Sequence, residues 1–504
     1  MQRCVIERSG VSRGHSTEVK KKPREGLNVE RSLNFAGLEG SAMKAANPNT
    51  RGNYQRKVGV ELRGSAGEPS IAPLSTGGKD GKAVDTSRLL EKVIDRENLN
   101  QAYKRVVKNG GSHGVDGMNV EALLLYLKET GESLRQQLLK GKNQPQPVRR
   151  VEIPKPGGGV RQLGIPTVVD RMIQQAIARV LSPIFEKEFS GNSYGFRPGR
   201  SAQQAIEQAA TYMQEGNKTV VDIDRENFFD RVNHDKLMSL LAKRIADKRL
   251  LRLIRKYLES GVMSQGLISP AEEGTPQGGP LSPLLSNVML HELDRELESR
   301  GHRFCRYADD CNIYVRSRKA GNRVMASISS FIEKRLKLKV NRKKSAVDSP
   351  MKRKFLGISF YRKKDGTGVR VHPESVKRVK EKVRAVTMPC NAMSMEQRVD
   401  RLNQIIRGWV NYFKVADMQK HCNKLDEWIR RRLRMCYWEQ WKKIKTRRDK
   451  LVRLGIPESK AWQYANTRKG SWRTAKSPIL CRTLTNDYFR NLGLTGLSVV
   501  YGRS

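Results

Sequence analysis

The sequence has few cysteines and no long apolar run, and each shortage excludes a class of protein. Only seven of its 504 residues are cysteines, and none forms a Cys-x-x-Cys pair. A disulfide framework and a zinc site of the usual spacing are therefore not expected. The cysteines are instead expected to be reduced thiols in a cytoplasmic protein. Because no run of about 18 apolar residues occurs, the sequence predicts no membrane-spanning helix and no membrane partner.

Acidic residues are scarce compared with basic ones. The chain has 97 Lys and Arg against 51 Asp and Glu, a formal net charge of +46. Cationic side chains that neutralise phosphates gain affinity by releasing counterions, so this charge predicts a nucleic-acid partner. The excess runs through the whole chain, which disfavours an anionic membrane surface. A ribosomal or nucleoid-type binding protein and an enzyme acting on nucleic acid both remain open at this point.

The chain divides into segments of different composition. Residues 1–86 are rich in Gly, Ser, Lys, Arg, Asn and Glu, have few periodic apolar positions, and are predicted to be mostly disordered. Helical periodicity begins near Ser87. Beyond it the pattern predicts the following elements: strands at 148–153 and 220–223, helices at 167–189 and 236–262, a hairpin at 302–317, and an almost wholly helical region from 374 to about 454.

Two groups of carboxylates stand at the ends of predicted strands. Asp309 and Asp310 lie between two β-forming runs, and Asp222 and Asp224 end the strand that begins at Val220. By itself, an Asp-Asp pair between strands is most often an ordinary turn. Two acidic strand ends in one sheet, however, repel each other unless a cation is bound. Since Mg²⁺ prefers oxygen ligands, the pattern predicts a site for two Mg²⁺ ions that serve nucleotidyl transfer.

Several motifs resemble those of group II intron-encoded reverse transcriptase/maturases. In chain order they are Arg161-Gln162-Leu163-Gly164-Ile165-Pro166, Tyr194-Gly195-Phe196-Arg197-Pro198-Gly199-Arg200, Gly274-Thr275-Pro276-Gln277-Gly278-Gly279-Pro280-Leu281 and Tyr307-Ala308-Asp309-Asp310. The resemblance runs from about residue 87 to the C-terminus and is greatest to the compact bacterial group IIC type. It implies an α+β right-hand polymerase fold, with fingers, a palm built on an antiparallel sheet, and an α-helical thumb.

The same resemblance implies a division into domains. Residues 87–372 correspond to the fingers and palm of the reverse transcriptase, and residues 373–455 to the thumb, or maturase-specific, domain. Residues 456–504 form a basic tail of the maturase region. Basic residues are dense between Lys420 and Lys450, which is consistent with a surface that follows phosphates.

The resemblance also implies roles for individual residues. Asp224, Asp309 and Asp310 would be the catalytic, metal-binding carboxylates. Asp224 is preferred to Asp222 because the family places an aromatic residue five positions after the catalytic aspartate, and that residue is Phe229. Phe229 would lie beneath the sugar of the incoming dNTP. Three further residues are implied to bind nucleotide or template: Lys155 and Arg161 on the triphosphate, and Gln277 on the template strand.

These roles predict an RNA-directed DNA polymerase and intron maturase. It would bind group II intron RNA, assist splicing, and copy the RNA from a DNA primer into cDNA at a DNA target site during retrohoming. Two residues depart from the family pattern, Arg225 where an apolar residue is usual and Asn227 where a lysine is usual. They keep open a splicing-only maturase with a decayed polymerase site. A domesticated reverse transcriptase in phage defence is the third hypothesis. A cytoplasmic ribonucleoprotein location is expected.

Overall fold

The computed structural model describes residues 85–154, 160–264, 267–269, 273–275, 278–364, 366–389 and 391–503. The disorder predicted for residues 1–86 concerns a segment that lies, as far as residue 84, outside these described residues. No helix in the described part of the chain is long and apolar enough to cross a membrane.

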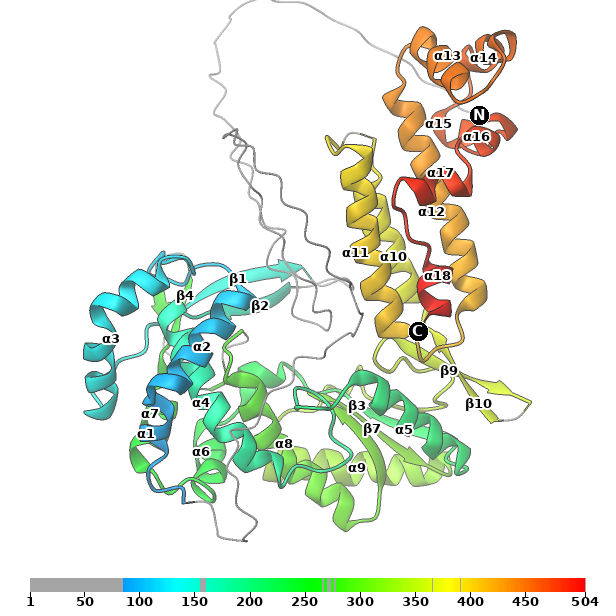
Figure 1. Cartoon of the computed structure of the whole chain (residues 1–504). Coiled ribbons are helices and arrows are strands. Elements are labelled where there is room, and N and C mark those ends of the chain that lie inside the picture. The colour runs from blue at the N-terminus through cyan, green and yellow to red at the C-terminus, as the bar shows by residue number, and fades with distance from the viewer. Residues whose placement is uncertain are drawn as a thin grey trace, which may run out of the picture.

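The N-terminal part of the described chain, together with two short strands between residues 262 and 269, builds a four-stranded sheet (Figure 1). Its strand order is β2-β1-β4-β5, with β1 and β2 antiparallel and β1 and β4 parallel. The elements are α1 (Leu89–Ile94), α2 (Arg96–Asn109), α3 (Leu123–Leu139), β1 (Val148–Pro154), β2 (Val160–Ile165), α4 (Val168–Glu186), β4 (Val262–Ser264) and β5 (Leu267–Ser269). Helix α4 packs against α1 and α2, and its Thr167 N-cap accepts a hydrogen bond from the Asp170 amide.

A second four-stranded sheet, entirely antiparallel, forms the palm. Its order is β6-β7-β3-β8, so β3, which is early in the chain, lies at the centre beside the β6–β7 hairpin. The elements are α5 (Ala202–Gln214), β3 (Thr219–Ile223), η1 (Phe228–Arg231), α6 (His234–Ala242), α7 (Lys248–Glu259), α8 (Ser282–Ser299), β6 (Arg303–Tyr307), β7 (Asp310–Val315), α9 (Arg318–Arg335) and β8 (Ala346–Asp348).

Successive side chains of the central strand β3 belong to two different hydrophobic cores, one on each face of the sheet. Val221 and Ile223 belong to one core, together with α4, α8 and α9, whereas Val220 belongs to the other, together with α5 and the thumb. Successive side chains of a strand point to opposite faces, so the even-numbered residues of β3 share the face of Val220. Asp222 and Asp224 therefore lie on the face of the sheet that α5 and the thumb also flank.

The rest of the chain is mostly helical and rises from the palm (Figure 1). A two-stranded hairpin of β9 and β10 joins palm and thumb, and the terminal helix α18 contacts both α11 and α12. The elements are β9 (Ile358–Lys363), β10 (Gly366–Val371), α10 (Pro373–Val386), α11 (Met395–Phe413), α12 (Gln419–Gln440), α13 (Ile444–Arg453), α14 (Glu458–Ala465), α15 (Ser471–Thr474), α16 (Pro478–Thr483), α17 (Asn486–Asn491) and α18 (Leu497–Gly502).

The prediction of one helix over 236–262 is wrong. Two helices, α6 and α7, occupy this region, and Val262 begins strand β4. The break has a local cause, since the carboxylate of Asp247 accepts hydrogen bonds from the amides of Arg249 and Leu250 and so starts α7. The other predicted strands and helices agree with the structure to within a few residues, and the α+β right-hand arrangement with an antiparallel palm sheet is confirmed.

Candidate active site

The two acidic strand ends meet in the palm sheet. Tyr307 pairs with Asp310, which leaves Ala308 and Asp309 as the two turn residues of the β6–β7 hairpin. Strand β7 also pairs with β3, and the last pair in this register is Ile223 with Cys311. The next residue on each strand is a carboxylate, Asp224 on one and Asp310 on the other. The sheet thus places Asp224 opposite the Asp309-Asp310 turn.

The backbone of Asp224 is fixed by the loop before β8. Its amide donates to the Ser345 hydroxyl at 3.0 Å, and its carbonyl accepts from the Asn341 amide at 2.9 Å. Lys344 belongs to the same loop, and its Nζ lies 4.0 Å from Asp224 Oδ2. Because the Lys344 side chain is 69% exposed, this cation is free to move.

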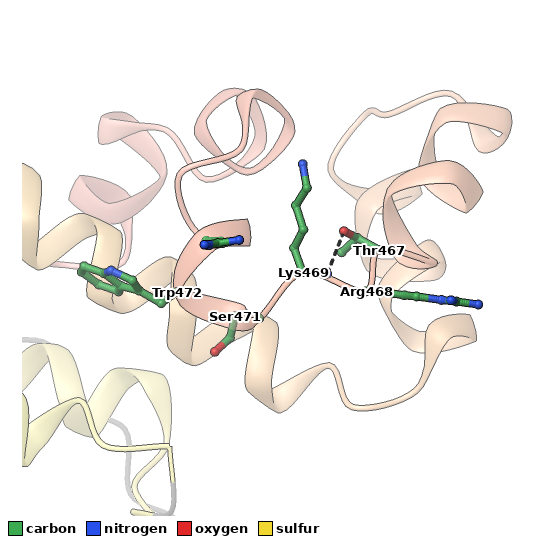
Figure 2. Close-up of a pocket in the computed structure, with 7 residues that line it drawn as sticks. Thr467, Arg468, Lys469, Ser471 and Trp472 are labelled. Carbon is green, nitrogen blue, oxygen red and sulfur yellow. Dashed lines mark hydrogen bonds between the residues drawn. The ribbon is translucent and has the colours of Figure 1, made fainter.

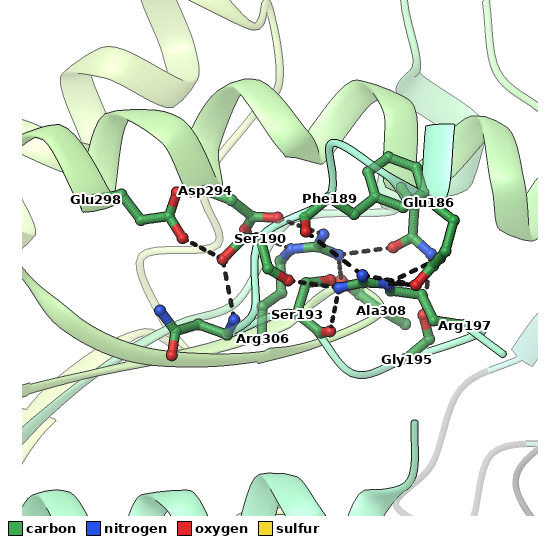
Figure 3. Close-up of polar contacts among 12 residues, drawn as sticks. Glu186, Phe189, Ser190, Ser193, Gly195, Arg197, Asp294, Glu298, Arg306 and Ala308 are labelled. Carbon is green, nitrogen blue, oxygen red and sulfur yellow. Dashed lines mark hydrogen bonds and ion pairs between the residues drawn. The ribbon is translucent and has the colours of Figure 1, made fainter. Parts of the chain in front are cut away.

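A buried arginine forms hydrogen bonds both to the turn and to helix α8 (Figure 3). Arg306, on β6, has no exposed surface and forms a bidentate ion pair with Asp294 of α8, with Nε–Oδ1 and Nη2–Oδ2 distances of 2.7 and 2.6 Å. Its third nitrogen, Nη1, donates to Asn287 Oδ1 and to the Ala308 carbonyl, both at 2.9 Å. The guanidinium therefore connects the turn that carries Asp309 directly to helix α8.

The segment before α5 packs against the same turn. Tyr194 donates its amide to the Arg306 carbonyl at 2.8 Å, and the Gly195 carbonyl accepts from Asn287 Nδ2 at 2.9 Å. A Cβ on Gly195 would lie 2.2 Å from the Ala308 amide nitrogen, so the approach requires glycine. Ala308 itself has a left-handed backbone, with φ of 56°.

A second buried arginine stabilises this segment. Arg197 pairs with Glu186 at 2.7 Å and also donates to the carbonyls of Ser190 and Ser193 (Figure 3). It thereby gives two carbonyls of this irregular segment a side-chain donor, in addition to the Ser193 amide that the Ser190 carbonyl also accepts. The motif that contains Arg197 thus packs, through Tyr194 and Gly195, against the turn that carries Asp309.

Burial, and after it the neighbouring carboxylates, raise the pKa values of Asp310 and Asp224. Reduced solvation and the neighbouring Asp309 raise the pKa of Asp310 to about 7. The pKa of Asp224 is also raised, first by partial burial and then by Asp222 and Asp309. Asp310 nevertheless keeps exposed surface at the start of β7, which leaves its carboxylate open to ions from solvent. Carboxylates under such mutual repulsion gain from binding a cation.

The donor set fits a divalent metal that also binds substrate phosphates. Among the described residues, no group of three or more Asp, Glu, His or Cys side chains is positioned to hold a metal ion. A Mg²⁺ ion of this kind requires only one or two carboxylates, because phosphates and waters supply the other oxygens. The facing carboxylates on β3 and the turn meet that requirement in chemistry and in placement.

The remaining predicted residues have different surroundings. Asp222 is bound by Arg353, whose Nε lies 3.1 Å from Oδ2, so its carboxylate is already engaged. Phe229 lies in η1, packed on the core and edge-to-face with Phe228 at 5.2 Å between ring centroids. Arg161 is exposed on β2, with its Cα opposite that of Ile153. Lys155 and Gln277 lie outside the described residues.

Tryptophan–arginine stacks recur on the thumb and the tail. Arg431 of α12 lies 3.8 Å from the ring centroid of Trp472 and donates to its carbonyl at 2.9 Å. Trp438 and Trp462 are similarly covered by Arg447 and Arg448. Trp472 and the loop before α15 line an open pocket whose other residues include Arg468, Lys469 and Arg473 (Figure 2). These cations form a surface suited to phosphates.

Sequence reasoning missed the buried polar residues that hydrogen-bond to the β6–β7 turn and to one another. Arg306, Asp294 and Asn287 were given no role, although Arg306 interrupts the apolar run of β6. A charged residue inside a buried strand requires a buried partner, and this is the signal that could have found the pair. The partner itself lies on a helix and is not identifiable from local pattern.

Two family descriptions match the chain in the order of its domains. "Reverse transcriptase (RNA-dependent DNA polymerase)" matches residues 153–360, and "Group II intron, maturase-specific domain" matches residues 376–455. The chain belongs to the group II intron reverse transcriptase/maturase family. By enzyme class it is an RNA-directed DNA polymerase.

Comparison with individual proteins gives the following similarities. This reverse transcriptase is 34% identical to "Protein YkfC" of Escherichia coli over 314 residues. The alignment covers 54% of this chain and 82% of that protein. It is 37% identical over 197 residues to "Group II intron-encoded protein LtrA" of Lactococcus lactis, covering 38% of this chain and 32% of that protein. Among solved structures, a "Partial Cas6-RT-Cas1--Cas2 complex" shares 26% identity over 49% of this chain and 42% of that chain, with a TM-score of 0.32.

Proposed function

We propose that this chain copies RNA into cDNA by two-metal nucleotidyl transfer with Mg²⁺ and dNTP substrates. The observation that carries this proposal is the register of the palm sheet, in which Asp224 faces the Asp309-Asp310 turn. Mg²⁺ held by these carboxylates would help a primer 3′-hydroxyl attack the dNTP and would stabilise the leaving pyrophosphate.

Other residues would position the nucleotide and the template. Phe229 would pack beneath the deoxyribose and oppose a 2′-hydroxyl. Arg161, which is exposed on β2, and Lys155, which follows β1, would bind the triphosphate as cations. Gln277 would contact the template strand beside the nascent pair. All four assignments come from the family resemblance, and the exposure of Arg161 supports its part.

The thumb and tail would bind group II intron RNA and assist its splicing. The arginine–tryptophan stacks on α12–α15 and the exposed cations around residue 468 support an RNA-binding surface. The proposal also states that the chain copies that RNA at a DNA target during retrohoming, within a cytoplasmic ribonucleoprotein. It further includes the division into domains at residues 87–372, 373–455 and 456–504. The last part of the proposal is that the chain is most similar to the compact group IIC type.

A splicing-only maturase is the second candidate. One observation favours it, since Arg225 places an additional positive charge beside the carboxylates that must bind metal. Were the polymerase site inactive, the RNA-binding surface of the thumb would still function. The two candidates differ in a single measurable property, the incorporation of nucleotides.

The test is Mg²⁺-dependent dNTP incorporation on an RNA template with a DNA primer. We expect incorporation by the wild-type protein and a loss of about a thousandfold or more in Asp309→Ala, on the scale of catalytic-site deletions. Asp487→Asn, at an exposed carboxylate of α17, is the matched control and should retain full activity. A folded, RNA-binding wild type that incorporates nothing would establish the splicing-only candidate instead.

A further inference from the structure

Arg225 follows Asp224 and enters the apolar core on the other face of the sheet. Its backbone forms a bridge with Val340, and its side chain lies over the Phe228 ring at 5.9 Å from the centroid. Both neighbours belong to the core that packs on α8 and α9. Arg225 is only 5% exposed. A guanidinium thus occupies a position in the core directly behind the carboxylates.

Apart from the Phe228 ring, the charge of Arg225 has no compensating contact among the described residues. Within the described part of the chain, its Nε, Nη1 and Nη2 atoms are buried and have no hydrogen-bond partner. Arginine remains protonated in proteins, so burial does not remove the charge. Arg306, which is also buried in the palm, is neutralised by Asp294. The field of Arg225 therefore acts on the nearest anions, and Asp224, its neighbour in the chain at the end of β3, is one of them.

We propose that Arg225 is a fixed counter-cation of the carboxylate cluster Asp224, Asp309 and Asp310, and that it weakens the affinity of this cluster for divalent metal ions. The proposal rests on the proposed function, because that function assigns the metal to these three residues. Arg225 then changes the metal affinity of the site from the opposite face of the sheet, without contact with substrate.

The physical reason is that the counter-cation stabilises the metal-free cluster more than the metal-bound one. Without metal, a positive charge behind the sheet relieves the mutual repulsion of the carboxylates. With metal bound, the same charge repels the cation, and the low-dielectric core screens this repulsion weakly. Lys344 also neighbours Asp224, but its exposed side chain can move into solvent when metal enters. Arg225 is confined by the core and cannot.

The experiment measures Mn²⁺ binding by the full chain, with the electron paramagnetic resonance signal of free Mn²⁺ as the readout. Arg225→Met removes the charge and keeps the approximate volume, whereas Arg225→Lys keeps the charge. We expect Mn²⁺ to bind about threefold or more tightly to Arg225→Met, and Arg225→Lys to stay close to wild type. Lys344→Met, which removes a mobile charge, should have the smaller effect.

Two controls make every result decisive. Thermal unfolding verifies that each variant is folded, and Arg225→Ile replaces Arg225→Met if the latter is not. Asp309→Ala shows whether the measured ion is bound by the carboxylates. If Asp309→Ala weakens binding but the folded apolar variant at position 225 binds Mn²⁺ no more tightly than wild type, the role of Arg225 is overturned while the proposed function stands. If Asp309→Ala leaves binding unchanged, the metal site fails and both proposals fall with it.

Discussion

Arg306 and Asp294 form an ion pair in which neither side chain has any exposed surface, with both guanidinium–carboxylate contacts at 2.6–2.7 Å. The pair joins β6 to α8, and the third guanidinium nitrogen donates to the carbonyl of Ala308 in the β6–β7 turn. Burying two charges is costly, and here the remaining donors and acceptors are satisfied by Asn287 and the turn. The ion pair fixes the position of the turn that carries Asp309, at the cost of removing two charges from water.

Removing one partner of this pair should be strongly destabilising. Asp294→Asn leaves the Arg306 charge buried and uncompensated, and we expect the free energy of unfolding to fall by about 3–5 kcal/mol. Urea denaturation measures the change. Arg490→Ala, which breaks the exposed pair with Asp487, is the control and should cost about 0–1 kcal/mol. Equal effects of the two variants would contradict the assigned role of the buried pair.

Replacing Gly195 by alanine should displace the catalytic turn. The new methyl would overlap the Ala308 backbone, which cannot move without shifting Asp309. We expect kcat for dNTP incorporation to fall by about tenfold or more, because small displacements of catalytic groups have effects of this size. Gly191→Ala, at a site where a Cβ meets nothing within 4 Å, is the matched control. Wild-type kcat in Gly195→Ala would show that the turn tolerates the shift.

Phe229→Ala should weaken discrimination against ribonucleotides. The ring packs on the core in η1, immediately after the strand that carries Asp224, and its removal would leave room for a 2′-hydroxyl. We expect the ratio of kcat/KM values for dNTP and rNTP to fall by about tenfold. Phe228→Leu, at the neighbouring buried ring, should leave the ratio unchanged. A ratio unaffected by Phe229→Ala would place the selection against ribose elsewhere.

Lys469→Ala should weaken RNA binding and reduce its dependence on salt. Lys469 is exposed on the tail loop beside Arg468 and Arg473, in the pocket of Figure 2. If it neutralises one phosphate, the slope of log K against log salt should fall in magnitude by about 0.7–0.9. Filter binding over a range of salt concentrations gives the slope. Lys334→Ala, on the palm helix α9, should retain the wild-type slope; a loss common to both variants would indicate a general effect of net charge.

Much of the fold was predictable because it depends on local pattern. Alternating apolar residues on both sides of Asp309-Asp310 require a hairpin, and the helical period after residue 374 requires a helical thumb. The division of residues 236–262 was missed because the signal that starts α7 is one capping side chain, Asp247, inside a segment that is apolar on both sides. Periodicity alone does not register such a break.

The sequence by itself determined that the chain binds nucleic acid, that two acidic strand ends exist, and that its motifs follow the order of a reverse transcriptase. Only the tertiary structure decided which charges are buried and which are paired. Asp222 is engaged by Arg353, Arg306 is neutralised by Asp294, and Arg225 is left unpaired within the described chain. The reason is physical: a charge is buried or paired by groups on other elements, in the case of Asp222 131 residues away, and no local pattern encodes that distance.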